Sequence, residues 1–274
     1  MERVTGLAPR FLFLYIIRLI LNATYEEPIG HIKNMKAPEN LYHYTSIESL
    51  LSIINGIDVN NEYLKFRSTH IAYLNDMTEG RLLQNALKRN GINENLITIL
   101  ESCKGYPFVM SLSENSDDLN MWRCYACSGS GTAIGFDYQS LRKSFNNLKK
   151  CEYTTIEELS KRFSHMRNPN EGEDCMPLSR LLSESYYYKH NSFKSENEWR
   201  IFDYSFPDGY QQKSNVIIPY KEIKVPVSAI TSITFGPKCD AYKNGFAIMS
   251  LLKSKVSANN FSNIEIKQSL VPLN

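Results

Sequence analysis

The chain has 274 residues, of which 31 are basic and 29 acidic, so its formal net charge is +2, and 42% of the residues are apolar. This length suits one large or two small domains with a real core, and the apolar fraction is that of a globular protein. The balanced charge gives no reason to expect a nucleic-acid or membrane partner.

Residues 1–40 are expected to be separate from the rest of the chain. The segment 11–21 is apolar except for Arg18. A membrane span needs about 20 apolar residues, so this segment predicts a buried or partner-covering helix instead. Residues 22–40 contain two prolines and a glycine and are predicted to be an extended lead-in. The remainder, 41–274, is predicted to be a single domain.

Short strands and helices alternate over the first half of this domain. Thr45 and Glu48 have the spacing of a capping box, which predicts a helix start directly after the first strand. Apolar residues at helical or alternating spacing, together with Gly and Asp at the boundaries, predict the other elements. The predicted strands are 41–44, 63–67, 108–113 and 132–136, and the predicted helices are 47–54, 76–87, 94–102 and 118–125.

The second half begins with a mainly helical insertion over about 138–192, which contains a polar loop near 168–174. After it, strands are predicted at 197–204, 214–220, 222–227, 230–235 and 263–269, with a helix over 240–254. The order lacks the regular βαβ alternation of a parallel sheet. The predicted fold class is therefore α+β, with a mostly antiparallel, split or curved sheet decorated by helices.

Two acidic residues stand two positions apart in the late strand, at Glu196 and Glu198, followed by Arg200. On a strand these three side chains would share one face. Two carboxylates on one face repel each other unless a cationic group lies between them. A cationic transition state is one such group. The alternative is a structural network in which Arg200 and Lys194 neutralise the acids.

Six motifs in a fixed order resemble a bacterial domain-of-unknown-function family. They are a Y-H-Y-T opening, an N-D-x-x-E turn, an S-x-S strand, an N-x-x-M-W-x-x-Y-A helix, an E-x-E-W-R strand and a closing I-x-x-I-x-x-G-P. In this chain they are residues 42–45, 75–79, 111–114, 120–126, 196–200 and 230–237. That family is in turn similar to ADP-ribosyltransferases, which use NAD as a substrate and fold around a split sheet.

The resemblance implies roles for residues on three strands. Glu198 matches the catalytic acid, and Glu196 matches the acid that orients an acceptor. His43 would hold a ribose or the nicotinamide side of NAD. Ser111 and Ser113 would support the nicotinamide pocket. The implied activity is ADP-ribosyl transfer or NAD hydrolysis, in the setting of a bacterial toxin or defence effector, with no metal.

Aromatic and basic residues complete the candidate NAD site. Tyr44, Trp122 or Tyr125 could stack on the nicotinamide or adenine ring. Arg67 or Arg123 could meet the diphosphate, because a guanidinium matches phosphate geometry. Each candidate also has a structural alternative: core packing for the aromatic rings, backbone bonding for the serines and an ordinary surface charge for Arg67. A non-catalytic nucleotide-binding or protein-interaction module therefore stays open.

Six cysteines are scattered along the chain, which favours a reducing, cytoplasmic setting over a disulfide framework. Cys124 and Cys127 form a lone C-x-x-C without a second pair, which is less than a zinc site requires. They are predicted to be small buried residues of a helix, with a metal site as the minor alternative. The acceptor of a transferred group stays open among a protein side chain, a nucleic acid, a small molecule and water.

Overall fold

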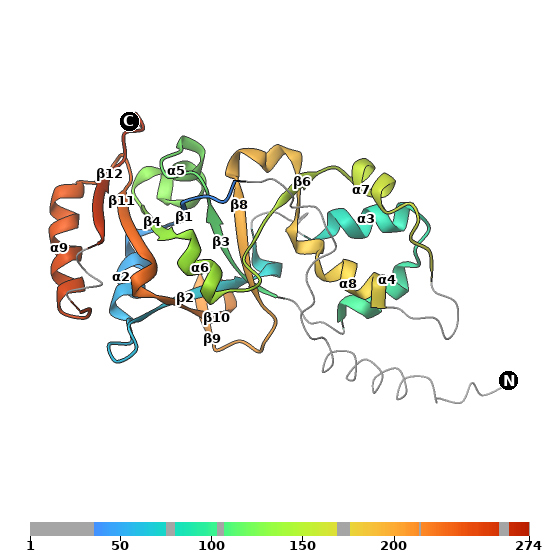
Figure 1. The fold of residues 1–274 in the computed structure, drawn as a ribbon, viewed down its shortest axis with the longest axis horizontal. Coiled ribbons are helices and arrows are strands. Elements are labelled where there is room, and N and C mark those ends of the chain that lie inside the picture. The colour runs from blue at the N-terminus through green and yellow to red at the C-terminus, as the bar shows by residue number, and fades with distance from the viewer. Residues whose placement is uncertain are drawn as a thin grey trace.

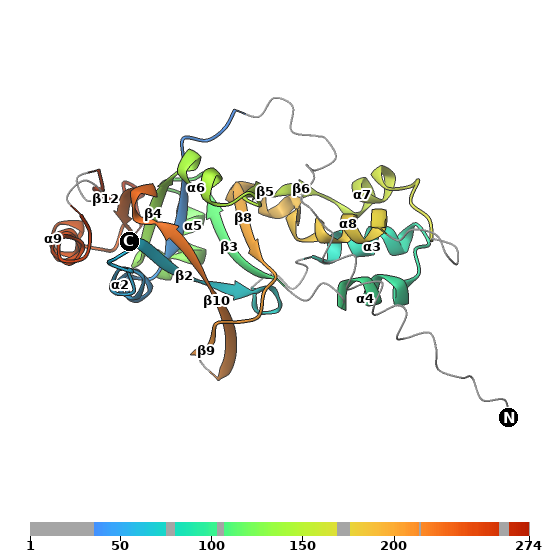
Figure 2. The ribbon, with the colours of Figure 1, turned by 60° about the horizontal axis from the view of Figure 1, so that its bottom comes forward.

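The computed structural model describes residues 36–74, 80–102, 107–168, 176–213, 215–257 and 263–273. The predicted N-terminal helix and the Asn75–Glu79 turn lie outside these residues. The α+β fold is confirmed, with a large and mostly antiparallel sheet (Figures 1 and 2). None of the described helices combines the length and the apolar composition needed to cross a membrane.

The strand order of the sheet is β12-β11-β4-β1-β3-β2-β10-β9, and β8 joins β3 outside this path and carries β5 on its other side. All pairings in this sheet are antiparallel except that of β11 with β12. The strands are β1 Asn40–Thr45, β2 Tyr63–His70, β3 Phe108–Ser113, β4 Thr132–Asp137, β5 Lys149–Lys150, β8 Glu198–Asp203, β9 Gly209–Lys213, β10 Val216–Pro226, β11 Ile230–Phe235 and β12 Glu265–Gln268.

The sheet is split at β3. One edge of β3 pairs with β8 along its whole length, from Phe108 to Ser113. The opposite edge is shared: β2 pairs near Val109 and β1 pairs only at Ser113. The strands β1 and β2 therefore diverge on either side of Ser111, and the sheet opens between them.

The main core lies between the sheet and the helices α2 (Ile47–Asn55), α6 (Tyr138–Ser144) and α9 (Ala241–Lys253). The helix α2 begins where Ser46, rather than the predicted Thr45, accepts a hydrogen bond from the Ser49 amide. On the other face of β1 and β4, α5 (Leu119–Tyr125) packs Trp122 against Tyr44. The sheet is thus covered on both sides near β1.

A second core belongs to a helical unit at the end of the molecule opposite α9 (Figures 1 and 2). Its elements are α3 Arg81–Arg89, α4 Glu94–Ser102, α7 Ile156–Arg162, α8 Met176–Ser183 and the parallel pair β6 Glu152–Thr154 and β7 Tyr188–His190. The predicted insertion 138–192 supplies only part of this unit, because α3 and α4 come from before β3. The unit is joined to the sheet through β7 and the 3-10 helix Asn191–Glu196.

Two predicted strand boundaries are wrong. Residues 214–220 and 222–227 were expected to be separate strands, but β10 continues through both, and Pro219 lies in the outer pairing with β9. The late acidic strand begins at Glu198, not at 197 or earlier, because Asn197 adopts a left-handed conformation with φ of 45°. Glu196 therefore ends a 3-10 helix and does not lie on the strand.

Candidate active site

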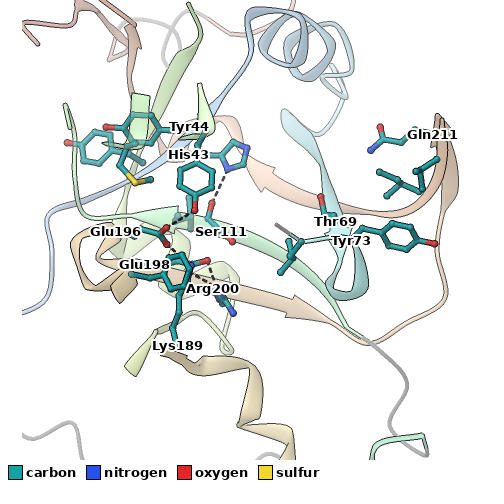
Figure 3. Close-up of a pocket in the computed structure, with 18 residues that line it drawn as sticks. His43, Tyr44, Thr69, Tyr73, Ser111, Lys189, Glu196, Glu198, Arg200 and Gln211 are labelled. Atoms are coloured by element: carbon teal, nitrogen blue, oxygen red, sulfur yellow. Dashed lines mark hydrogen bonds and ion pairs between the residues drawn. The ribbon is translucent and has the colours of Figure 1, made fainter. Parts of the chain in front are cut away.

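A cavity of about 610 Å³ opens at the split in the sheet (Figure 3), a size typical of small-molecule sites. The consecutive residues Tyr42, His43 and Tyr44 all border it, although successive side chains of a strand point to opposite faces. This is geometrically consistent with a cavity at the free edge of β1. Its other lining residues are Thr69, Tyr73, Leu74, Ser111, Leu112, Met121, Tyr125, Lys189, Phe193, Glu196, Glu198, Arg200, Gln211, Val216 and Ile218.

His43 lies in the fork between the diverging strands. Its Nδ1 is 3.0 Å from the carbonyl oxygen of Ser111, the residue of β3 between its contacts with β2 and β1. Because a carbonyl oxygen only accepts, Nδ1 must carry the proton. Burial lowers the pKa of His43, and the hydrogen bond to Ser111 opposes this in part, so the ring is neutral at physiological pH. Within the described part of the chain Nε2 has no partner, and as the unprotonated nitrogen it can accept a hydrogen bond from a hydroxyl group.

Two neighbouring cations keep the carboxyl group of Glu198 ionised. Arg200 donates from Nε to Oε1 and from Nη2 to Oε2, both at 2.8 Å, and Lys189 donates from Nζ to Oε2 at 2.8 Å. Burial alone would raise the pKa of Glu198, but the two cations outweigh it and hold the pKa at about 2. A carboxylate has about four acceptor positions, so Oε1 keeps room for one more donor.

Glu196 meets the same lysine from the other side. Lys189 Nζ lies 2.5 Å from Oε2 of Glu196, and the Tyr125 hydroxyl donates to Oε1 at 2.6 Å. Burial raises the pKa of Tyr125, and the hydrogen bond to Glu196 adds to this. Because Asn197 is left-handed, Glu196 ends a 3-10 helix while Glu198 begins a strand. Their carboxylates nevertheless contact the same ammonium group, that of Lys189 (Figure 3).

The structure brings six of the nine predicted site residues to this cavity, and they are His43, Tyr44, Ser111, Tyr125, Glu196 and Glu198. Tyr44 borders the cavity, but its side chain already has partners in the protein. The hydroxyl donates to the carbonyl oxygen of Asn115 at 2.9 Å, and the ring contacts Trp122 edge to face. Its predicted stacking on a ligand would have to compete with these contacts.

Three predicted residues do not line the cavity. Trp122 is 0% exposed, and its indole Nε1 donates to Asp117 at 2.6 Å, so the ring packs in the core. Ser113 is buried, and its hydroxyl donates to the carbonyl oxygen of Glu196. Arg67 lies on the open face of β2, with its guanidinium 4.6 Å from the centre of the Tyr220 ring. Their structural alternatives describe them better than the binding roles expected from the sequence.

Several residues of the site were not predicted. Lys189 takes the neutralising position expected for Lys194, which lies on the 3-10 helix before the acids. A lysine directly after the aromatic run Tyr186–Tyr188 was the available signal. Thr69 and Gln211 reach the cavity through pairings between distant segments, and Tyr73 follows β2 on a 3-10 helix. Nothing in their local sequence indicates a site.

The prediction that the C-x-x-C cysteines are buried is wrong. Both Cys124 and Cys127 are exposed, near the end of α5. Among the described residues, no group of three or more His, Cys, Asp or Glu side chains has the arrangement of a metal site.

These features define an α+β protein with a split, mostly antiparallel sheet and a charged cavity at the split. Residues 121–201 match the family described as "Protein of unknown function (DUF2971)", which confirms the resemblance to a domain-of-unknown-function family. No curated protein matches the chain. The structure of DarT from Thermus sp. 2.9 in complex with ADP-ribosylated single-stranded DNA is similar at 13% identity and a TM-score of 0.33, over 86% of this chain and 94% of that one.

Proposed function

We propose that this chain is an NAD-using, ADP-ribosyltransferase-like enzyme that cleaves the bond between nicotinamide and ribose. The observation that carries the proposal is the convergence of His43 and the two acids, Glu196 and Glu198, on one cavity. The sequence resemblance predicts the same set of residues.

The chemistry of the site suits this reaction. When the C–N bond breaks, nicotinamide leaves with the electron pair and the ribose carbon becomes an oxocarbenium-like cation, which a nearby carboxylate stabilises. Glu198 is ionised at neutral pH, and its Oε1 can accept a hydrogen bond from a ribose hydroxyl. His43 offers Nε2 as a second hydroxyl acceptor. An acceptor group or water then forms the new bond to the ribose carbon and loses its proton, and Glu196 is the carboxylate that would orient it and accept this proton.

A non-catalytic binding module is the second candidate, and one observation favours it. Two acids and two bases, Glu196, Glu198, Lys189 and Arg200, form a buried network whose formal charges sum to zero. Such a network stabilises a cation less than an isolated carboxylate pair would, and it also suits a purely structural role. The cavity would then bind a nucleotide without turning it over.

Nicotinamide release from NAD by purified protein distinguishes the two candidates. The matched variants are Glu198→Gln and Glu222→Gln, since Glu222 is a glutamate on β10 whose ion pair with Lys65 is partly exposed and outside the cavity. The enzyme proposal expects a loss of about 100-fold or more for Glu198→Gln and little change for Glu222→Gln. Circular dichroism must show that both variants are folded at the assay temperature.

Two results would contradict the enzyme proposal. Equal release by wild type and folded Glu198→Gln removes this acid from the reaction. A thermal shift of the wild type with ADP-ribose, without any release of nicotinamide from NAD, favours the binding module; ligand at 100 times its dissociation constant should stabilise the fold by about 2.7 kcal/mol. The family resemblance supports the proposed setting of a bacterial toxin or defence effector, and the scattered cysteines support a cytoplasmic location.

A further inference from the structure

The two ends of the cavity differ in charge. All its lysine, arginine and glutamate side chains lie at the β8 end, and they are Lys189, Glu196, Glu198 and Arg200. At the end formed by β2, β9 and β10 the described lining residues are neutral, and they are Thr69, Tyr73, Leu74, Gln211, Val216 and Ile218. Figure 3 shows Thr69, Tyr73 and Gln211 grouped apart from the acids, with His43 and Ser111 nearer the middle. A ligand that fills the cavity must therefore have one neutral, partly apolar end.

Strand pairing fixes the neutral end. Gln211 of β9 is paired directly with Ile218 of β10, and Thr69 of β2 is paired with Tyr220, two residues further along β10. Paired residues share a face, and so do residues two apart on one strand. Gln211, Ile218 and Thr69 therefore form one continuous face toward the cavity.

Tyr73 closes this end from the 3-10 helix Ile71–Tyr73, which His70 caps by accepting a hydrogen bond from the Ala72 amide. The Tyr73 ring is 39% exposed and meets His70 edge to face at 5.7 Å, so part of its surface is available to a ligand. In the described part of the chain the Gln211 amide has no hydrogen-bond partner. A free donor and acceptor pair thus lies beside an aromatic ring and an aliphatic wall.

We propose that this neutral end binds the adenine ring of the dinucleotide, with Gln211 pairing to the edge of the base and Tyr73 contacting its face. A glutamine amide matches the adjacent donor and acceptor of adenine, N6 and N7, in a bidentate way, and aromatic side chains stack on bases. The inference rests on the proposed function, since it assigns one half of the same ligand. It also fixes a direction: adenine at β9 and β10, and the nicotinamide ribose at Glu198.

The test separates the two halves of the ligand. Binding of ADP-ribose, AMP and nicotinamide mononucleotide is measured by calorimetry for wild type, Gln211→Leu and Tyr73→Ala. Controls are Gln212→Leu and Tyr210→Ala, which change the same residue types as the cavity variants. Both control residues lie on β9, on the face opposite Gln211, and Tyr210 is 68% exposed. We expect about a tenfold or larger loss of ADP-ribose and AMP affinity for each cavity variant, from one lost bidentate pair or one lost stacking contact. Nicotinamide mononucleotide affinity should stay within about twofold, and neither control should change any of the three.

The outcomes keep the adenine site and the enzyme proposal distinguishable. If wild type releases nicotinamide from NAD but folded Gln211→Leu and Tyr73→Ala keep full affinity for AMP and ADP-ribose, the adenine site is overturned and the enzyme stands. If the affinity of both variants for nicotinamide mononucleotide falls as much as their affinity for AMP, the adenine assignment is overturned as well. If wild type binds none of the three nucleotides, both proposals fail together.

Discussion

The ammonium group of Lys189 lies 2.8 Å from Oε2 of Glu198, and the side chains are only 4% and 7% exposed. The same ammonium reaches Glu196 at 2.5 Å. A buried charge is tolerated only when it is paired and hydrogen-bonded. The lysine is therefore the group that allows two acids to be held close together inside the cavity, while Arg200 fixes the orientation of one of them.

Replacing Lys189 by methionine should destabilise the protein strongly. The change leaves Glu196 without its cation and Glu198 with only Arg200, and removing one partner of a buried ion pair costs about 3–5 kcal/mol. Urea unfolding followed by circular dichroism measures the loss. Lys243→Met is the control, because Lys243 is 82% exposed and pairs with Asp240 at the surface. Its effect should stay below about 1 kcal/mol, and equal effects of the two variants would contradict a supporting role for Lys189.

Glu198 should make folding depend on pH in the acid range. Its pKa is about 2 in the folded protein against an ordinary value of 4.5. A lowered pKa adds stability that is fully present above 4.5 and is lost as the pH falls toward 2. Glu198→Gln should therefore be less stable than wild type at neutral pH, and the difference should shrink as the pH is lowered through this window. Unfolding midpoints measured at several pH values check this. A difference that stays constant with pH would show that the charge of Glu198 contributes nothing.

His43 should produce a second, separate dependence on pH. Burial lowers its folded pKa below the ordinary value of 6.5, so the unfolded chain takes up a proton first as the pH falls. Stability should decrease as the pH drops below about 6.5. In His43→Asn the amide can still donate to the Ser111 carbonyl but does not titrate, so the slope just below neutral pH should flatten. An unchanged slope in folded His43→Asn would contradict this role of His43.

Local patterns in the sequence predict much of the fold. The strand Phe108–Ser113 and the helix Glu94–Ser102 have the predicted bounds, because alternating or helical apolar spacing and clear boundary residues specify them within one segment. The strand Gly209–Lys213 was missed, because its sequence is polar and only its pairing with β10 makes it a strand. The start of the strand at Glu198 was placed too early, because nothing local indicates that Asn197 turns left-handed.

The candidate site likewise contains residues that local motifs predict and residues that only contacts between distant segments bring to the cavity. Motif order identified His43, Ser111 and the two acids, all of which reach the cavity. Trp122 packs in the core and not at the cavity, and a buried core tryptophan and a ligand-stacking one have the same local pattern in a helix. Lys189 and Gln211 were missed, because each is brought to the site by elements that are distant in sequence or structurally irregular. Charge neutralisation and the neutral end of the cavity are properties of the assembled sheet and depend on contacts between segments.

Asp117 should hold the C-terminal segment against α5. Its Oδ1 accepts from Trp122 Nε1 and from the Ser269 hydroxyl, both at 2.6 Å, and its Oδ2 accepts from the Leu270 amide at 2.8 Å. Asp117→Ala leaves these donors unpaired, at about 1–3 kcal/mol for each one that stays buried. We expect faster hydrogen exchange at the Leu270 amide and a lower free energy of unfolding.

The neighbouring variant Asp118→Ala provides the comparison for this prediction. Asp118 caps α5 by accepting from the amides of Asn120 and Met121, so its loss should cost about 0.5–2 kcal/mol while the Leu270 amide stays protected. If Leu270 exchanges at the same rate in Asp117→Ala as in wild type, the carboxylate is not what fixes the C-terminal segment. The expected pattern, with only Asp117→Ala exposing Leu270, would show that the segment is held by one side chain and not by general packing on α5.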